Sequence, residues 1–360
     1  MSARTAQIFL QKTAISLLLV AIGTAGLAIP AAARAQQAPS QQTPSLYGPK
    51  EVSPFAVRQG ELGSCYFHAS VAALSKAVPD TMRKAIAPEP GGAYRVHFFE
   101  GADEVVFPED IEYATVHSFD RSEGEWVKVL MRAYAQRVLR KNLNQQIEKS
   151  NLIPVFVRPM AQSVLNQEGG ILVAYDRAIR LVVTQNGDLD KNALKLKLAE
   201  EAKLMGIPPS ATDLVSGFLD QNGFIDNLAQ TVRQNGEFFG AYRSLGQGGI
   251  PSEVLKAFIG SAHVGSVGDQ VRTLAQLRRL GPESAAMVAG TKPAAGAVDP
   301  GKWWVGAHAY TVLGYDELTQ TVSLRNPWGG HPAPDGTFSL PVAVFLAAFD
   351  SYAASGEAGQ

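Results

Sequence analysis

The stretch that decides the fold is Arg58-Gln59-Gly60-Glu61-Leu62-Gly63-Ser64-Cys65-Tyr66-Phe67. It holds the only cysteine of the chain, followed by an apolar run to Leu74 that predicts a helix starting at Cys65. Two glycines in front of the cysteine allow a tight turn into that helix. Because a helix N-terminus carries partial positive charge and free N–H groups, it favours a thiolate. Together with a nearby imidazolium, it can bring a thiol pKa down to roughly 3.5–7.5.

A cysteine alone does not decide between a nucleophile and a small buried side chain, so its neighbours carry the interpretation. A thiolate that attacks a carbonyl needs donors for the resulting oxyanion. The backbone N–H of Cys65 can supply one, and the side-chain amide of Gln59 can supply another without adding a charge. Gly63 and Ser64 are expected to support this turn.

Two later segments supply the other groups of a cysteine-histidine-asparagine arrangement. His308 begins an alternating run, and Asn326 ends the next run of this kind. A turn at Gly314-Tyr315-Asp316 is expected to join the two strands and bring both side chains together. The imidazole can then exchange a proton with the thiol, while the Asn carbonyl oxygen fixes its tautomer.

These segments resemble the calpain-type cysteine proteases, which have a papain-like fold. Five blocks occur in the family's order and together span about 210 residues: Gln59–Cys65, Glu125–Ala135, Gly240–Gly249, His308–Tyr310 with Arg325–Gly329, and Asp335–Phe338 followed by Phe345. The resemblance implies an α+β fold with an α-rich lobe over residues 51–262 and an antiparallel β-rich lobe over 263–360.

The resemblance also implies roles for single residues. Cys65 would attack the scissile carbonyl, His308 would act as base and then as acid, and Asn326 would orient the histidine. Gln59 would bind the oxyanion, and Trp328 would shield the His–Asn hydrogen bond from water. The chain departs from the family where Ser64 and Tyr66 replace Asp and Trp, and where Gly330-His331 replaces Glu-Trp. These changes bear on substrate fit and on calcium dependence.

The N-terminus has the three-part pattern of a secretory signal peptide. A basic start precedes an apolar run from Ala14 to Ile29, and Ala33-Arg34-Ala35 is a small-x-small cleavage signal. The run is short for a membrane span. We therefore expect residues 1–35 to be removed near Ala35, which leaves a secreted or periplasmic chain without a stable membrane anchor. Residues 36–50, rich in Gln, Pro and Ser, are expected to form a flexible leader.

Periodicity predicts helices at 125–139, 191–204, 270–280 and 341–349, and strands at 284–289, 309–313 and 321–325. Residues 141–237 have no counterpart in the family's blocks, so we expect a helical insertion that regulates the site or selects substrates. Its expected apolar seam is Leu194, Leu196, Leu198 and Leu204.

Neither charge nor metal-ligand spacing indicates another partner. The 32 basic and 33 acidic side chains give a net charge of −1, which does not favour nucleic acid. The run from Asp188 to Asn192 begins like a calcium loop, but Ala193 stands where glycine is required and no Glu follows at the twelfth position. We expect that no metal or other cofactor is required, and no recognisable EF-hand supports calcium dependence.

Four histidines are isolated: His97, His117, His263 and His331. His68, one turn after Cys65, is expected to be structural. Trp303-Trp304 could line a cleft or fill a core.

The expected function is that of a cysteine endopeptidase acting on protein or peptide substrates. Two alternatives belong to other classes: a catalytically silent papain-like module that binds peptides or proteins, and a cell-wall amidase or peptidase. The complete set of Cys65, His308, Asn326 and Gln59 favours an active enzyme over the silent module. The Asn-Pro-Trp-Gly block fits the cell-wall alternative poorly.

Overall fold

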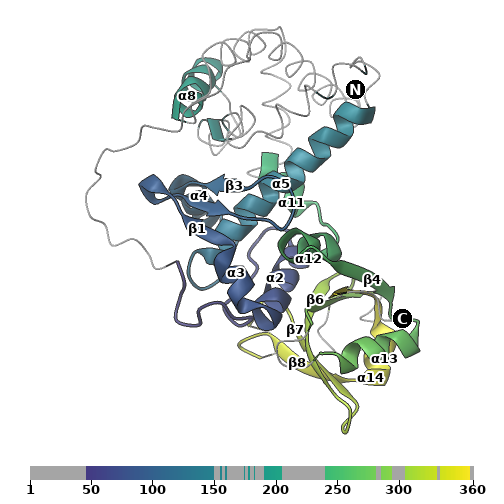
Figure 1. The fold of residues 1–360 in the computed structure, drawn as a ribbon. Helices are drawn as coiled ribbons and strands as arrows, with labels where there is room; N and C mark the ends of the chain where they lie inside the picture. The colour runs from purple at the N-terminus through teal and green to yellow at the C-terminus, as the bar shows by residue number, and fades with distance from the viewer. Residues whose placement is uncertain are drawn as a thin grey trace. The chain divides into compact units, whose positions relative to one another are not determined.

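The computed structural model describes residues 46–149, 190–204, 240–280, 285–293, 305–330 and 333–356, with a few isolated residues between 155 and 182. These residues form two compact units. The larger unit comprises the described parts of 36–134 and 245–360, and the smaller unit those of 135–244. The described strands all lie in the larger unit, and together with its helices they give a mixed α+β arrangement (Figure 1).

The elements follow one another in chain order. The helices are α2 (Cys65–Ala77), α3 (Pro79–Lys84), α4 (Pro108–Val116), α5 (Trp126–Lys149), α8 (Lys191–Leu204), α11 (Gly240–Gly246), α12 (Pro251–Ile259), α13 (Gln270–Arg278) and α14 (Val342–Ala348), with a short 3-10 turn at Pro90–Gly92. The strands are β1 (Ile86–Pro88), β2 (Tyr94–Val96), β3 (Glu104–Val106), β4 (Ala262–Ser266), β5 (Met287–Thr291), β6 (Ala309–Asp316), β7 (Thr321–Arg325), β8 (Thr337–Pro341) and β9 (Phe349–Ser355).

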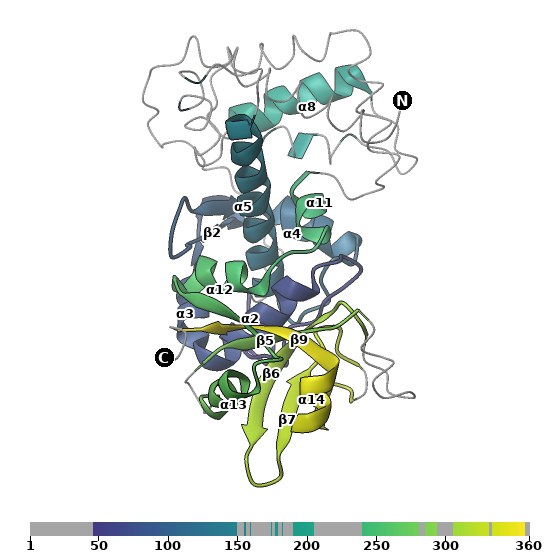
Figure 2. The same ribbon diagram turned by 90° about the vertical axis from the view of Figure 1, so that its right-hand side faces the viewer.

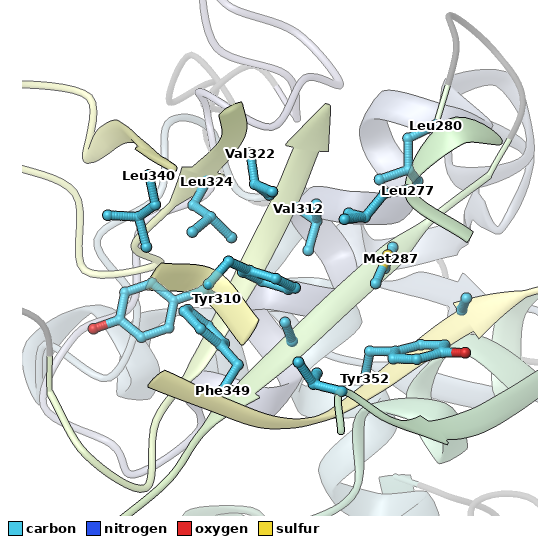
Figure 3. Close-up of a cluster of buried hydrophobic side chains, with 14 of the residues drawn as sticks. Leu277, Leu280, Met287, Tyr310, Val312, Val322, Leu324, Leu340, Phe349 and Tyr352 are labelled. Carbon is cyan, nitrogen blue, oxygen red and sulfur yellow. The ribbon is translucent and has the colours of Figure 1, made fainter. Parts of the chain in front are cut away.

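An antiparallel six-stranded sheet forms the second half of the larger unit, in the order β4-β9-β5-β6-β7-β8. One face of β6 presents Tyr310 and Val312 to a hydrophobic cluster, in keeping with the two-residue period of a strand. Figure 3 shows Tyr310 and Val312 in this cluster, together with Leu277 and Phe349. α13 and α14 contribute to the same cluster, so they cover this face of the sheet.

α2 packs on β5 and β6 and also contacts α12, as Figure 2 shows. Almost every residue of α2 after Cys65 is buried, which explains why apolar side chains occur on all sides of this helix. The side chain of Thr311, from β6, donates a hydrogen bond of 2.9 Å to the carbonyl of Ala69 in the middle of α2. This bond satisfies a buried hydroxyl, and it holds the helix and the sheet in register.

A smaller antiparallel sheet, β1-β2-β3, completes the larger unit with α3 and α4. The N-terminal turns of α5 are buried, including the predicted stripe Trp126, Val129, Leu130, Ala133 and Tyr134. α5 continues to Lys149, ten residues beyond the predicted end at Leu139, and thus into the predicted insertion.

The smaller unit contains α8, which has the predicted bounds. Leu194 and Leu198 are buried, but Leu196 is 69% exposed and Leu204 is 47% exposed. The predicted seam was therefore wrong for these two residues, because side chains two positions apart lie on different faces of a helix. Within the same unit, Arg177 and Glu201 form a buried ion pair of 2.6 Å.

The sequence analysis misplaced the turn that precedes Asn326. Gly314, Tyr315 and Asp316 belong to β6, and the reversal falls at residues 317–320. The Asp316 carboxylate accepts hydrogen bonds from the backbone N–H groups of Leu318 and Thr319, so the aspartate holds the turn that follows it. Strands β1 to β4 and β9 were not anticipated, because each is short or lacks clear alternation.

Several predictions fall on residues that the structure does not describe. They are the signal peptide at 1–35, most of the leader, Trp303-Trp304, His331 and most of the predicted insertion.

The glycine at position 60 is needed for close backbone approach, and its φ is not positive. A Cβ at Gly60 would lie 1.8 Å from the carbonyl oxygen of Ser118. We predict that Gly60→Ala lowers the free energy of unfolding by ~1–3 kcal/mol, the usual cost of overpacking. Chemical denaturation measures this change. Gly314→Ala is the matched control, because a Cβ there meets nothing within 4 Å. Equal stability of the two variants would contradict the prediction.

Candidate functional site

Cys65 is the first residue of α2, as predicted, and its side chain is partly exposed. Ser64 is the N-cap residue, but its hydroxyl makes no capping bond to the helix backbone. The first-turn N–H groups of α2 therefore face the thiol without a side-chain competitor. Gly63 is required here by close approach, because a Cβ would lie 2.6 Å from the carbonyl oxygen of Gly246.

The end of α11 and the residues that follow it lie beside α2. The Tyr66 hydroxyl donates to the carbonyl of Leu245 over 3.3 Å. A Cβ at Gly249 would fall 2.5 Å from the Tyr66 ring, so only glycine can pack there. This contact places residues 245–249 next to Cys65, in the part of the chain where the resemblance predicted a Gly-Gly segment.

The backbone of His308 is held on both sides by Thr291 at the end of β5. The Thr291 hydroxyl accepts from the N–H of His308 at 3.0 Å, and the Thr291 N–H donates to the carbonyl of His308 at 2.9 Å. The preceding residue, Ala307, has a φ of 53°, in the left-handed region. Such a conformation costs a non-glycine residue of order 1 kcal/mol, so the surrounding bonds maintain it.

His308 and Asn326 are brought together as predicted. Nε2 of His308 lies 3.1 Å from Oδ1 of Asn326. Because a carboxamide oxygen only accepts, Nε2 carries the proton, and Nδ1 of the neutral ring is left with a lone pair. Oδ1 of Asn326 also accepts from the backbone N–H of Trp328 at 3.1 Å, which fixes the amide orientation.

The indole of Trp328 lies against the imidazole, with ring centroids 4.5 Å apart and planes tilted by 46°. The indole is 43% exposed, while His308 and Asn326 are 6% and 2% exposed. Trp328 therefore covers the two polar side chains from solvent, which strengthens the hydrogen bond between them.

Cys65 begins α2, which packs on β6, and β6 starts at Ala309, directly after His308. The backbone N–H of Ala309 is one of the groups that favour the thiolate of Cys65. The helix start that carries Cys65 therefore lies toward the strand that follows the predicted base. Cys65, His308 and Asn326 all belong to the larger unit.

Burial shifts the pKa values of both Cys65 and His308. It raises the pKa of the Cys65 thiol, and the N–H groups of Ala309, Tyr66 and Cys65 itself oppose this only in part. Burial lowers the pKa of His308, and the hydrogen bond to Asn326 opposes that shift. For the thiol beside a neutral imidazole, desolvation of the anion outweighs the N–H groups. The lowering expected from the sequence needs the imidazolium as well, and it stays a prediction.

Gln59 lies beside the cluster and is 6% exposed. Its Nε2 donates to the carbonyl of Leu62 over 2.7 Å, and its backbone N–H donates to the carbonyl of Pro327 over 2.8 Å. A carboxamide carries two N–H groups. One of them holds the side chain on the loop, and the second can serve an oxyanion.

Three hydrogen bonds join the segment before Gln59 to the segment around Asn326. Besides the bond to Pro327, Nη2 of Arg58 donates to the carbonyl of Pro334 at 3.1 Å. Nη2 of Arg325 donates to the carbonyl of Val57. Arg325 is 1% exposed, and burial lowers its pKa to about 10.

His68 is structural, as predicted, and it is bonded at both ring nitrogens. Its Nε2 lies 2.9 Å from Oδ2 of Asp120, and its Nδ1 lies 3.0 Å from both the carbonyl oxygen and the hydroxyl of Ser64. Ser64 is fully buried, so this Ser-His-Asp chain offers no nucleophile to a substrate.

The described residues hold no group of three or more His, Cys, Asp or Glu that could bind a metal ion. Among the other histidines, His97 pairs with Asp103 at 2.7 Å, and His263 bonds to the carbonyl of Gly356 at 3.1 Å. No helix in the described parts of the chain is both long and apolar enough to cross a membrane.

Thr291 and Asp120 were missed by the sequence analysis. Neither lies in a recognisable motif, and each acts through contacts with segments far away in the chain. Thr291 is the last residue of a strand that leads toward the histidine, and this was the single local signal. Comparison of the chain with models of protein families and with curated proteins found no match.

The pKa shifts predict a wide pH plateau for any reaction in which His308 takes the Cys65 proton. Activity falls on the acid side when His308 is protonated, and a lowered pKa moves that limb below ~6.5. It falls on the alkaline side when the thiol ionises, and a raised pKa moves that limb above ~8.5. The measurement is kcat/KM for an uncharged peptide against pH. An acid limb above 6.5 would contradict the assignment.

Proposed function

We propose that this chain is a cysteine endopeptidase of the calpain kind with a papain-like two-lobe arrangement. The observation that carries the proposal is the 3.1 Å bond between His308 Nε2 and Asn326 Oδ1, at the start of the strand on which the Cys65 helix packs. The bond leaves a basic nitrogen on the imidazole, and the N–H of Ala309, the next residue, favours the thiolate of the partly exposed Cys65. A nucleophile at a helix start and a base at a strand start match the arrangement that the resemblance implies.

In this mechanism Nδ1 of His308 takes the thiol proton while the Cys65 sulfur bonds to the scissile carbonyl carbon. The carbonyl π electrons move to oxygen, and the oxyanion accepts from the N–H of Cys65 and the free amide N–H of Gln59. The C–N bond then breaks as His308 returns the proton to the leaving amine. A thioester remains on Cys65.

Deacylation repeats these steps with water. His308 takes a proton from water as its oxygen attacks the thioester, the C–S bond breaks, and the sulfur recovers the proton. Asn326 holds the imidazole in the tautomer that both half-reactions need. Since burial opposes a lone thiolate and a lone imidazolium, the proton moves between two groups whose charges compensate each other.

The direct test combines a substitution with covalent labelling. We expect Cys65→Ala to abolish hydrolysis of unfolded protein substrates with little change in unfolding free energy, because the side chain sits partly exposed at a helix start. An epoxide-type thiol inhibitor should label the unmodified chain at Cys65, and His308→Ala should slow this labelling. Labelling without hydrolysis would support a silent binding module, and hydrolysis by Cys65→Ala would exclude the nucleophile.

Two further variants should give graded losses. Gln59→Ala should lower kcat by about 10²–10³, the range for one oxyanion donor. Asn326→Ala should lower kcat without removing activity, because Thr291 still holds the His308 backbone while the ring loses its partner. Steady-state kinetics separates these effects from binding. An effect on KM alone would make the residue a binding group.

A further inference from the structure

A buried carboxylate joins the two segments that would bind the oxyanion. Asp120 is 3% exposed. Its Oδ2 accepts from Nε2 of His68 and from the Ser122 hydroxyl, each at 2.9 Å. Its Oδ1 accepts from the backbone N–H of Ser122 at 2.9 Å, and Nζ of Lys128 lies 3.8 Å away. The carboxylate is thus held by partners within the fold and does not face a substrate.

On one side, Asp120 acts on the turn that presents Cys65. His68, which it holds, places Nδ1 3.0 Å from the carbonyl oxygen and the hydroxyl of Ser64. Ser64 is the residue directly before Cys65 and caps α2. The direction of the first N–H groups of the helix, including that of Cys65, therefore depends on this buried contact.

On the other side, the chain around Asp120 holds the chain around Gln59. The two residues face each other in an antiparallel bridge. The N–H of Gly60 donates to the carbonyl of Phe119 at 3.2 Å, and the N–H of Arg121 donates to the carbonyl of Arg58 at 2.8 Å. Asp120 is thus connected to both expected oxyanion donors. Its side chain leads through His68 and Ser64 to the N–H of Cys65, and its backbone pairs with that of Gln59.

We propose that Asp120, acting through His68, is a positioning residue for the oxyanion site, an inference that rests on the proposed function. An oxyanion is stabilised only when its donors lie ~2.7–3.1 Å from it. The two donors stand on different segments, a loop and a helix start. The bonds of Asp120 set the separation between these segments.

The test must separate positioning from stability, because a buried carboxylate also supports the fold. Asp120→Asn keeps the size of the side chain and removes its charge. We expect kcat to fall ~10–10²-fold, less than on loss of an oxyanion donor itself, with KM unchanged. Alkylation of Cys65 by iodoacetamide forms no oxyanion, so its rate should fall much less than kcat does. His68→Gln should reproduce the fall in kcat, and it replaces Asp120→Asn in this test if Asp120→Asn does not fold.

Asp110→Asn is the matched control. Asp110 is fully buried in the same unit, and its carboxylate pairs with Arg132 at 3.2 Å, on α4 and α5. This variant should lose stability and keep its kcat per titrated Cys65. A fall in kcat as large as that of Asp120→Asn would show that loss of any buried carboxylate explains the effect, and would overturn the inference.

A double-variant cycle gives the decisive comparison. If Asp120 acts through His68, Asp120→Asn combined with His68→Gln should lose little more than either variant alone. Losses that multiply, or iodoacetamide alkylation that slows as much as kcat in Asp120→Asn, would overturn the inference and leave the proposed function standing. An unmodified chain that hydrolyses no peptide would overturn both.

Discussion

The packing of α2 on β5 and β6 is the constraint on which the site depends. Cys65 and His308 are 243 positions apart in the sequence, and no local geometry relates them. The hydroxyl of Thr311 bonds to Ala69 within this contact, so a shift of the helix along the sheet would leave a buried hydroxyl without its partner. The same packing puts the N–H of Ala309 among the groups that favour the thiolate of Cys65.

Hydrogen bonds from neighbouring residues hold His308 and the start of the helix that carries Cys65. Thr291 holds the backbone of His308, Asn326 holds its ring, and the N–H of Trp328 holds the amide of Asn326. Asp120 and His68 do the same for the start of α2. Buried polar groups with satisfied bonds are rigid, and rigidity keeps donors in place without reorganisation during a reaction.

The parts that could be predicted from sequence are those with local signals. Cys65 at a helix start, His308 at a strand start and Asn326 at a strand end each follow from a short pattern, and the structure brings His308 and Asn326 together. The helix at 191–204 is set by its own periodicity. Patterns of this kind depend on a few adjacent residues, so they can be recognised without knowledge of the rest of the chain.

The parts that could not be predicted depend on distant contacts. Gly60 looked like a turn residue, but its need for glycine comes from the carbonyl of Ser118, which the loop meets only in the folded chain. Leu196 looked like part of a seam, but its face of α8 is exposed. Strand β9 was missed because it lies between β4 and β5, and both its neighbours come from earlier parts of the chain.

The distinction between local patterns and distant contacts also explains the protonation of Cys65 and His308. The local sequence around Cys65 favours a thiolate, because a helix start supplies N–H groups and partial positive charge. Folding adds desolvation, which acts on the sulfur and on the imidazole in opposite directions and favours the neutral form of each. In the proposed mechanism a charged sulfur is tolerable only beside a charged imidazole, so the two groups would act as one proton-sharing pair. The packing of α2 on β6 would then set the reactivity of the thiol, because it sets the separation between the start of the helix and the start of the strand.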